Sequence, residues 1–207
     1  MIIIPSVSIG NVPQLAIDLI IHSYGFACVE SLDDEFLAPF IGPMDHTSGA
    51  PAPEGIATAA QLFRLGQDHI VQLRSPPLTG FKQRFLQSLA QRLQKDELKD
   101  SKLMFIGSAN AGMSESDSAS TIVEQRSSEA QDYPESGFLK EATNLFPGSE
   151  MVVMWVHEGN NFSDAQKLAK ELVRILHLEP REFKTPVSWT AVYGRNMPLG
   201  IEEGLYT

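Results

Sequence analysis

The segment from Pro5 to Ser23 constrains the fold more than any other part of the sequence. The apolar stretch from Ile2 to Ile9 runs into a single glycine, Gly10, and a helical pattern of apolar residues follows at once. Glycine readily adopts the sharp turn that such a junction needs. The sequence therefore predicts a buried strand up to Ile9 and an amphipathic helix over 12–23.

The same junction raises a functional question, because a strand, a glycine and a helix N-terminus are also the parts of many phosphate sites. Asn11 and Gln14 have the spacing of a helix N-cap pair, so both side chains would compete with a ligand for the free backbone donors. Pro13 has no N–H to contribute. Nucleotide fingerprints need several glycines where this segment has only Gly10. We therefore interpret the segment as a packing joint rather than a ligand cradle.

The chain of 207 residues is long enough to bury a full core, and we expect one domain over 1–194. Its 43% hydrophobic and 20% charged residues are ordinary for a soluble globular protein. We expect no membrane span, because no apolar run approaches the ~18 residues that one needs. We also expect no secretory signal, because the apolar start has no basic region and soon meets Pro5.

The single cysteine, Cys28, cannot form an intrachain disulfide, which favours a reducing compartment. It lies in the strand-like segment 26–30, where we expect a small buried apolar residue rather than a nucleophile. The expected location is the cytoplasm, with the nucleus as a second candidate. The net charge of −10, from 16 Lys and Arg against 26 Asp and Glu, makes nucleic acid a poor partner.

Apolar strand-like runs alternate with helical periodicity along the chain, which predicts an α/β domain with a central, mostly parallel or mixed sheet flanked by helices. Beyond the first strand, we expect strands over 26–30, 56–65, 69–74, 102–108 and 151–157. The turn-like Gly66-Gln67-Asp68 should join two of these as a hairpin. The runs 102–108 and 151–157 are continuously apolar, which predicts strands covered on both faces near the sheet centre.

Two further helices are expected from their periodicity. The segment 79–98 is predicted to bury one stripe, made of Phe81, Phe85, Leu89 and Leu93. A helix through Leu176 should begin at a capping box of Ser163 and Gln166. It is predicted to bury Ala165, Leu168, Ala169, Leu172 and Leu176.

Irregular structure is expected in two internal segments and at the end of the chain. The stretch 109–136 is rich in serine and acidic residues and predicts a long loop or a partly disordered insertion. The stretch 42–55 holds three prolines. After a strand-like segment over 188–193, periodicity is lost, and 195–207 is predicted to be a flexible tail.

The search for a catalytic site finds none, so we expect no catalytic residue, no cofactor and no metal. The five histidines show no ligand spacing, and there is no G-x-S-x-G elbow. The run Gly107 to Gly112 is the nearest candidate for a ligand loop, and turn formation explains it equally well. Glu158 and Asp164 flank a helix start, where acidic groups are favoured whatever the function.

The tail ends in Leu205, Tyr206 and Thr207, which place an apolar residue, a tyrosine and a carboxylate together. Such an end can be captured by a pocket that offers backbone donors and a lysine. These three residues are the predicted partner-binding site of the chain.

Three ordered segments of the chain resemble the proteasome assembly chaperone 2 family. They are the opening block PSVSIGNVPQLAIDLII, the sequence EGNNFSDA before a helix, and the P-x-S-W motif from Pro186 to Trp189. The resemblance implies a non-enzymatic subunit that pairs with assembly chaperone 1 and sits on the α-ring of the proteasome core particle during assembly. It also implies that Leu205, Tyr206 and Thr207 insert between α subunits.

Two alternatives remain open at this stage. One is a small-molecule enzyme of nucleoside-phosphorylase type, in which a glycine turn at Gly10 or Gly107 meets phosphate. The other is a simple dimerising scaffold, which would associate with itself. For a paired chaperone we expect an apolar surface that another chain covers, on the exposed side of the 56–74 hairpin or on the first helix.

Overall fold

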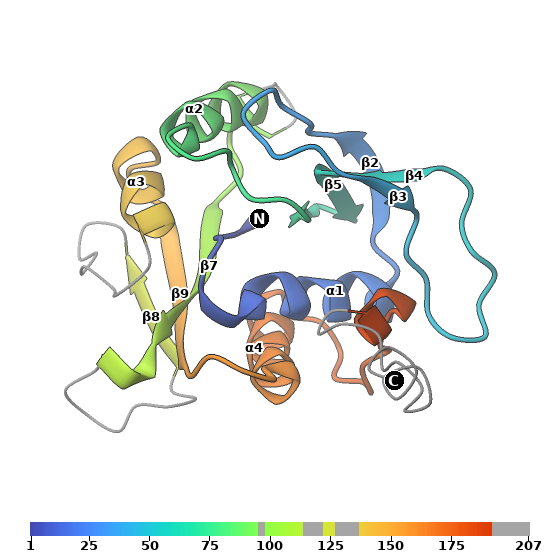
Figure 1. Ribbon diagram of the computed structural model, residues 1–207. Helices are drawn as coiled ribbons and strands as arrows, with labels where there is room; N and C mark the ends of the chain where they lie inside the picture. The colour runs from blue at the N-terminus through green and yellow to red at the C-terminus, as the bar shows by residue number, and fades with distance from the viewer. Residues whose placement is uncertain (95–97, 114–121, 127–136, 192–207) are drawn as a thin grey trace, which may run out of the picture.

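A computed structural model describes residues 1–94, 98–113, 122–126 and 137–191 of the chain. Within these ranges, seven strands form one sheet in the order β2-β5-β6-β1-β7-β9-β8. Helices α1 and α4 cover one face of the sheet, and α2 and α3 cover the other (Figure 1). The predicted single α/β domain with a mixed sheet is confirmed.

The elements follow one another along the chain with these bounds. The strands of the main sheet are β1 Ile2–Pro5, β2 Ala27–Ser31, β5 Ala60–Leu65, β6 Asp68–Leu73, β7 Leu103–Asn110, β8 Ile122–Arg126 and β9 Glu150–Val156. The helices are α1 Val12–Tyr24, α2 Lys82–Leu93, α3 Gly137–Leu145 and α4 Phe162–Ile175. A separate ribbon consists of β3 Ile41–Pro43 and β4 Ile56–Thr58, and short 3-10 helices are η1 Ile9–Asn11, η2 Ala111–Met113 and η4 Val187–Ala191.

The core of the sheet is parallel. Strand β1 pairs in parallel with β6 on one side and β7 on the other, and β7 pairs in parallel with β9. Successive side chains of β1 alternate between the two faces, with Ile3 in the cluster under α1 and α4 and Ile2 and Ile4 in the cluster under α2 and α3. The apolar runs predicted as strands covered on both faces are β7 and β9, while the middle strand of the order is β1.

The joint after β1 differs in detail from its prediction. The strand ends at Pro5 rather than Ile9, and Gly10 makes the turn with φ +68°, as expected. The N-cap pair is wrong: Asn11 is itself left-handed at φ 51° and its side chain makes no capping bond. The Gln14 amide donates instead to the backbone carbonyl of Ser6 at 2.9 Å, because the loop after β1 lies closer than the helix end.

The two later helices are confirmed with shorter bounds. Helix α2 buries Phe85, Leu89 and Leu93, whereas Phe81 precedes it and stacks on Phe36 with ring centroids 5.7 Å apart. Helix α4 buries the predicted alanines and leucines but begins at Phe162, so the capping box at Ser163 and Gln166 is wrong. The first free N–H, that of Phe162, donates to the Asn160 side chain at 3.2 Å.

Three segments expected to be irregular or extended are organised differently. Residues 109–136 contain the end of β7, η2 and strand β8, which pairs antiparallel with β9. Helix α3 was not predicted, and β3 lies at the start of the proline-containing stretch. The strand predicted over 188–193 is wrong, because Val187–Ala191 forms a 3-10 helix, and the boundary at 194 lies outside the described residues.

Cys28 is exposed, so its prediction as a buried residue is wrong. The physical reason is the position of β2 at the edge of the sheet, where it pairs only with β5 and the register shifts between Cys28 and Glu30. The thiol accepts from the Gln61 amide at 3.4 Å, and partial burial raises its pKa.

Among the helices in the described ranges, none has the length and apolar character required to cross a bilayer.

The turn at Gly10 gives a test of the joint. A Cβ at this position would lie 1.8 Å from Nδ2 of Asn161, so Gly10→Ala adds a steric overlap to the strain of a left-handed residue. We expect it to lower the free energy of unfolding by about 2–4 kcal/mol in urea denaturation. Gly25→Ala is the matched control, because Gly25 has φ +73° but no atom within 4 Å of the added Cβ. Equal losses in the two variants would contradict the close packing at Gly10.

Candidate functional site

The predicted site residues Leu205, Tyr206 and Thr207 lie outside the described residues, as does the whole of 192–207. The structure does show where the chain leads into this segment. The last described residues form η4, which follows an irregular connection from the end of α4 and lies against α1 (Figure 1). The side chains that hold η4 in this place form the most connected polar cluster near the C-terminal segment.

Trp189 is the apolar centre of this attachment. Its side chain is only 7% exposed and stacks on Phe162 at the start of α4, with ring centroids 4.5 Å apart and planes 6° apart. Its indole N–H donates to Oδ2 of Asp18 in α1 at 3.3 Å. Oδ1 of the same carboxylate accepts from the Gln72 amide of β6 at 2.6 Å. One aspartate therefore ties η4 to both α1 and the sheet.

Asp45 makes the second attachment, from the loop after β3. Its carboxylate accepts from the backbone N–H of Ser188 at 3.2 Å and also from the Ser188 hydroxyl. The same carboxylate lies 3.4 Å from the Arg74 guanidinium and 3.9 Å from Nε2 of His22. Asp45 is therefore shared between η4, the sheet and α1.

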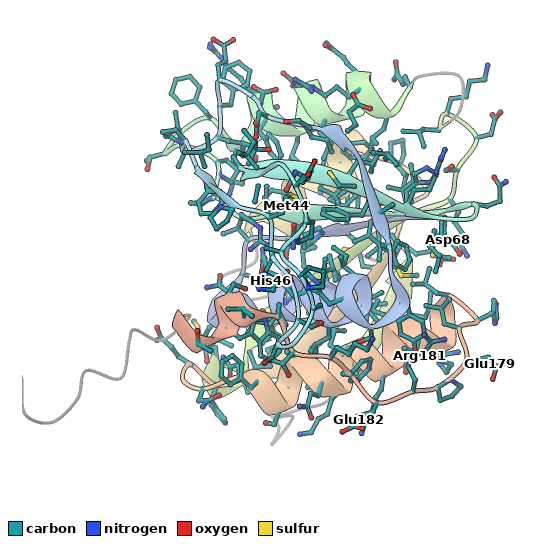
Figure 2. The ribbon with its side chains drawn as sticks, turned by 90° about the vertical axis from the view of Figure 1, so that its right-hand side faces the viewer. Met44, His46, Asp68, Glu179, Arg181 and Glu182 are labelled. Atoms are coloured by element: carbon teal, nitrogen blue, oxygen red, sulfur yellow. The ribbon has the colours of Figure 1, made fainter. Side chains whose placement is uncertain are left out.

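Backbone contacts continue the same attachment along the loop. The N–H of Val187 donates to the carbonyl of His46 at 2.8 Å, and Thr47 forms an isolated bridge with Pro186. Figure 2 looks on to this side of the molecule and shows His46 close to α1. We call the residues Asp18, Asp45, Gln72, Arg74, Ser188 and Trp189 the clamp.

Burial sets the electrostatics of the clamp. The pKa of Asp18 is raised, because its removal from water disfavours the charged form more than Arg74 and the Gln72 bond favour it. Burial lowers the pKa of His22, against the attraction of the neighbouring Asp45 carboxylate. Burial therefore favours the neutral form of the His22 ring, although the clamp carboxylates Asp45 and Asp18 oppose it.

The clamp was not predicted from the sequence. Asp18 interrupts the otherwise apolar run from Leu15 to Ile21, which was the available signal. Its partners Gln72 and Trp189 lie 54 and 171 residues away, so spacing along the chain could not connect them. The P-x-S-W motif does contain two clamp residues, Ser188 and Trp189, and this gives the motif a structural role.

A cavity of about 410 Å³ lies beside the clamp, at the carboxyl ends of the parallel strands β1 and β6. Ligands of open α/β sheets bind at such ends, so this is where an enzyme site would be expected. Its polar groups are already engaged: both Asp18 oxygens accept bonds within the chain, and the Gln14 amide donates to Ser6. Oε1 of Gln14 and Nε of Arg74 make no bond but are shielded from solvent, so neither is presented to a ligand.

The Gly10 turn is likewise filled by the chain itself. The Ser8 hydroxyl accepts from the N–H of Ser108 at 3.0 Å, and the Ser108 hydroxyl donates to the carbonyl of Ile9 at 2.5 Å. On the other side, the turn meets the Asn161 side chain. The packing joint predicted for this segment is what the structure shows, although serines and Asn161 occupy it rather than the predicted cap pair.

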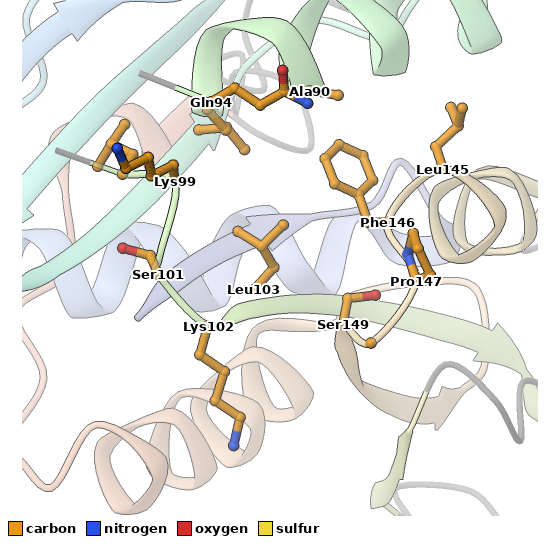
Figure 3. A pocket seen from close by; sticks show the side chains of 13 residues that line it. Ala90, Gln94, Lys99, Ser101, Lys102, Leu103, Leu145, Phe146, Pro147 and Ser149 are labelled. Atoms are coloured by element: carbon orange, nitrogen blue, oxygen red, sulfur yellow. The ribbon is translucent and has the colours of Figure 1, made fainter. Parts of the chain in front are cut away.

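A second cavity, of about 340 Å³, lies at the amino ends of β7 and β9 between α2 and α3 (Figure 3). Leu103 and Phe146 contribute apolar surface, and Lys102 extends away from the middle of the cavity. The ammonium of Lys102 pairs with Glu150 at 2.6 Å. Polar and apolar side chains line this cavity together, and the ammonium of Lys102 is already paired.

The other sequence candidates are dispersed. Residues Gly107 to Asn110 continue strand β7 rather than forming a ligand loop, and the turn interpretation for them is also wrong. Asp164 pairs with Lys167 at 3.4 Å in the first turn of α4. Over the described parts of the chain, no three His, Cys, Asp or Glu side chains are grouped so that they could hold a metal ion.

Comparison with known proteins finds relatives that are named as proteasome assembly chaperones. Proteins named Proteasome assembly chaperone 2 are 25% identical in Xenopus laevis, over 97% of this chain and 93% of that protein, and 24% identical in Danio rerio, over 95% and 92%. PbaA of Pyrococcus furiosus, an archaeal homologue of proteasome-assembly chaperone, shares the fold with a TM-score of 0.64. Its identity is 14%, and the match covers 87% of this chain and 83% of PbaA.

The model of the PAC2 family matches residues 2–179. This range runs from the first residue of β1 to the connection between α4 and η4, so it includes every strand and helix of the main sheet. The chain therefore belongs to the PAC2 family, and the resemblance to proteasome assembly chaperone 2 that its sequence shows is confirmed.

Proposed function

We propose that this chain is a subunit of a proteasome assembly chaperone that pairs with assembly chaperone 1 and binds the α-ring of the core particle during assembly. Its C-terminal residues Leu205, Tyr206 and Thr207 insert into a pocket between α subunits. The protein acts by binding and not by catalysis, in the cytoplasm and also in the nucleus. Family membership over residues 2–179 is the observation that carries the proposal.

The clamp supports the role given to the tail. It fixes η4 on the body of the domain through the buried Trp189 and the shared carboxylate of Asp45. The segment 192–207 therefore starts from a defined point of the fold. Its 16 residues could reach at most about 55 Å when fully extended. A fixed starting point and a limited reach raise the effective concentration of the tail at a nearby pocket.

The three terminal residues have complementary chemistry. Leu205 would fill an apolar hollow, Tyr206 would add aromatic contact and a hydrogen bond, and the Thr207 carboxylate would make a charge-assisted bond to a lysine. A three-residue anchor binds weakly after the cost of ordering it. Two such tails on one heterodimer, with a contact between faces, would bind firmly and still release one at a time.

Removal of Leu205 to Thr207 tests the tail. We expect the truncated chain to bind α-ring intermediates about ten- to a hundredfold more weakly, because one of the linked anchors is lost. Surface-immobilised α-ring with the heterodimer in solution measures the affinity. Pairing with assembly chaperone 1 should be unchanged. Glu203→Ala is the matched control within the same segment, and unchanged binding by the truncated chain would refute the tail's role.

The clamp gives a second test through Asp18. Asp18→Ala leaves the donors of Trp189 and Gln72 unpaired in the core and should lower the free energy of unfolding by about 2–3 kcal/mol. Asp18→Asn is the control. Its amide can accept from Trp189 and donate to the Gln72 carbonyl after rotation of that side chain, so we expect a change within about 1 kcal/mol.

The pH dependence of stability tests whether Asp18 is a buried acid. Because the pKa of Asp18 is raised above 3.8 in the fold, its contribution to stability is present below that pH and is lost as the pH rises through the folded value. The parent should therefore lose stability relative to Asp18→Asn as the pH rises from 3.8. Parallel stability curves for the two proteins would show that Asp18 is not a buried acid.

The enzyme alternative has one observation in its favour, the cavity of about 410 Å³ at the carboxyl ends of β1 and β6. A nucleoside-phosphorylase-like activity would require phosphate and nucleoside to bind there. We expect isothermal titration calorimetry with inorganic phosphate, and with adenosine or uridine, to show no binding, because the charged groups of the cavity, Asp18 and Arg74, are paired within the chain. A measurable heat that Arg74→Ala abolishes would favour the enzyme instead.

A further inference from the structure

The ribbon of β3 and β4 presents an apolar face to solvent. Ile41 lies opposite Thr58 and Pro43 opposite Ile56, so these four side chains share one face of the ribbon. Ile41 is 73% exposed and Ile56 is 56% exposed, whereas Ala57 on the other face is buried. We call Ile41, Pro43, Ile56 and Thr58 the ribbon face.

The edge strand β2 lies next to the ribbon face. The Ser31 hydroxyl is 3.2 Å from that of Thr58, which joins the end of β2 to the ribbon. The Gln61 amide lies 3.4 Å from both the Cys28 sulfur and the Ile56 carbonyl, which joins them a second time. Val29, at the register shift of β2, is a further exposed apolar residue at 45%. The ribbon and β2 therefore lie side by side (Figure 1).

The segment that contains the ribbon and the end of β2 is acidic. Residues 30–58 carry six carboxylates and no lysine or arginine, and the first basic residue of the whole chain is Arg64. The carboxylates of the segment are those of Glu30, Asp33, Asp34, Glu35, Asp45 and Glu54. The cations that other elements bring near are Arg64 of β5 and two arginines of α2. Arg84 lies over the ring of Phe36 at 6.0 Å, and the guanidinium of Arg92 donates to the carbonyl of Asp33 at 2.7 Å. Asp45 is engaged in the clamp.

We propose that the ribbon face and β2 bind a different chain that has an apolar centre and a rim of lysine or arginine. The inference rests on the proposed function, since it identifies the surface through which the chaperone subunit pairs. Exposed apolar residues mark an interface when they are contiguous and rimmed by polar groups. A basic rim on the partner would neutralise the carboxylates, whereas a mismatched charge costs several kcal/mol.

A second copy of this chain fits the surface poorly. In a symmetric dimer the same patch meets itself, so the six carboxylates of each 30–58 segment would face those of the other, with fewer arginines (Arg64, Arg84 and Arg92) near each segment to offset them. The charge therefore selects against self-pairing and in favour of a complementary partner. This distinguishes a heterodimeric chaperone from the dimerising scaffold that the sequence leaves open.

The proposed interface differs from the two surfaces that the sequence suggested, the first helix and the 56–74 hairpin. The first helix cannot supply the interface, because almost every residue of α1 is buried between the sheet and α4. Of the 56–74 segment, β5 and β6 lie inside the sheet. The large apolar residue that this segment exposes is Ile56 in β4, which pairs with β3, a strand that was not predicted.

The apolar part of the surface is tested by the double variant Ile41→Ser/Ile56→Ser. Biolayer interferometry against purified assembly chaperone 1 should show about a hundredfold weaker pairing, about tenfold for each isoleucine. Met113→Ser is the matched control, because Met113 is 60% exposed and lies in η2, beyond the end of β7. Thermal unfolding of each variant shows whether the fold is retained. Undiminished pairing by a folded double variant would overturn the proposal.

The charged part is tested by Glu54→Lys, at a residue two positions before Ile56. We expect it to weaken pairing about three- to tenfold and to reduce the salt dependence of the association rate. Native mass spectrometry of the parent alone should show a monomer. A homodimer that Ile41→Ser/Ile56→Ser dissolves would show that the occupant is a second copy and would overturn the choice of partner.

The outcomes separate this inference from the proposed function. If the double variant pairs normally and captures the α-ring, the chaperone role stands and the ribbon face is not its interface. If the parent neither pairs with assembly chaperone 1 nor captures the α-ring, the proposed function fails, and the inferred partner for the ribbon face fails with it. If the double variant loses pairing while the Met113→Ser control retains it, the surface is assigned.

Discussion

The close approach of Gly10 to Asn161 is the constraint on which the rest of the structure depends. The turn brings the start of α1 against the residue that precedes α4, with space only for a hydrogen atom at Gly10. Helices α1 and α4 can then lie side by side on one face of the sheet. The next residue after Asn161 is Phe162, which supplies the ring on which Trp189 stacks. A contact at the first turn of the chain thus determines where its last described segment is held.

The sequence predicts the layers of the fold but not the contacts between them. Apolar periodicity identified β1, α1, β7, β9 and α4, because each buries a face or both faces whatever its neighbours are. The predicted cap of the first helix was wrong because the Gln14 side chain donates to the carbonyl of Ser6 across a loop. A local sequence pattern cannot reveal such a tertiary contact. The predicted burial of Cys28 was wrong because β2 is an edge strand, and the order of strands in a sheet is not encoded in the composition of one strand.

The same distinction applies to the candidate site. The tail residues Leu205 to Thr207 could be named from the sequence, since a chain end has a recognisable chemistry and the family resemblance supplied its role. The clamp could not be, because Asp18 and Trp189 are 171 residues apart, and no pattern of spacing along the chain connects them. Strand β8 was missed because its segment is polar, and its pairing with β9 places it at the sheet edge.

The two proposed binding steps, pairing with a partner chain and capture of the α-ring by the tail, depend on different interactions. Pairing through the ribbon face would be apolar in its centre and selective through charge, so it suits a long-lived and specific heterodimer. Capture by the tail would depend on three residues on a 16-residue segment, so it is weak alone and gains from being linked to a second tail. An assembly factor has to bind an intermediate firmly and then leave the finished particle. A stable pair with weak, separately released anchors satisfies both requirements, and the buried clamp would fix the start of this chain's own anchor on its domain.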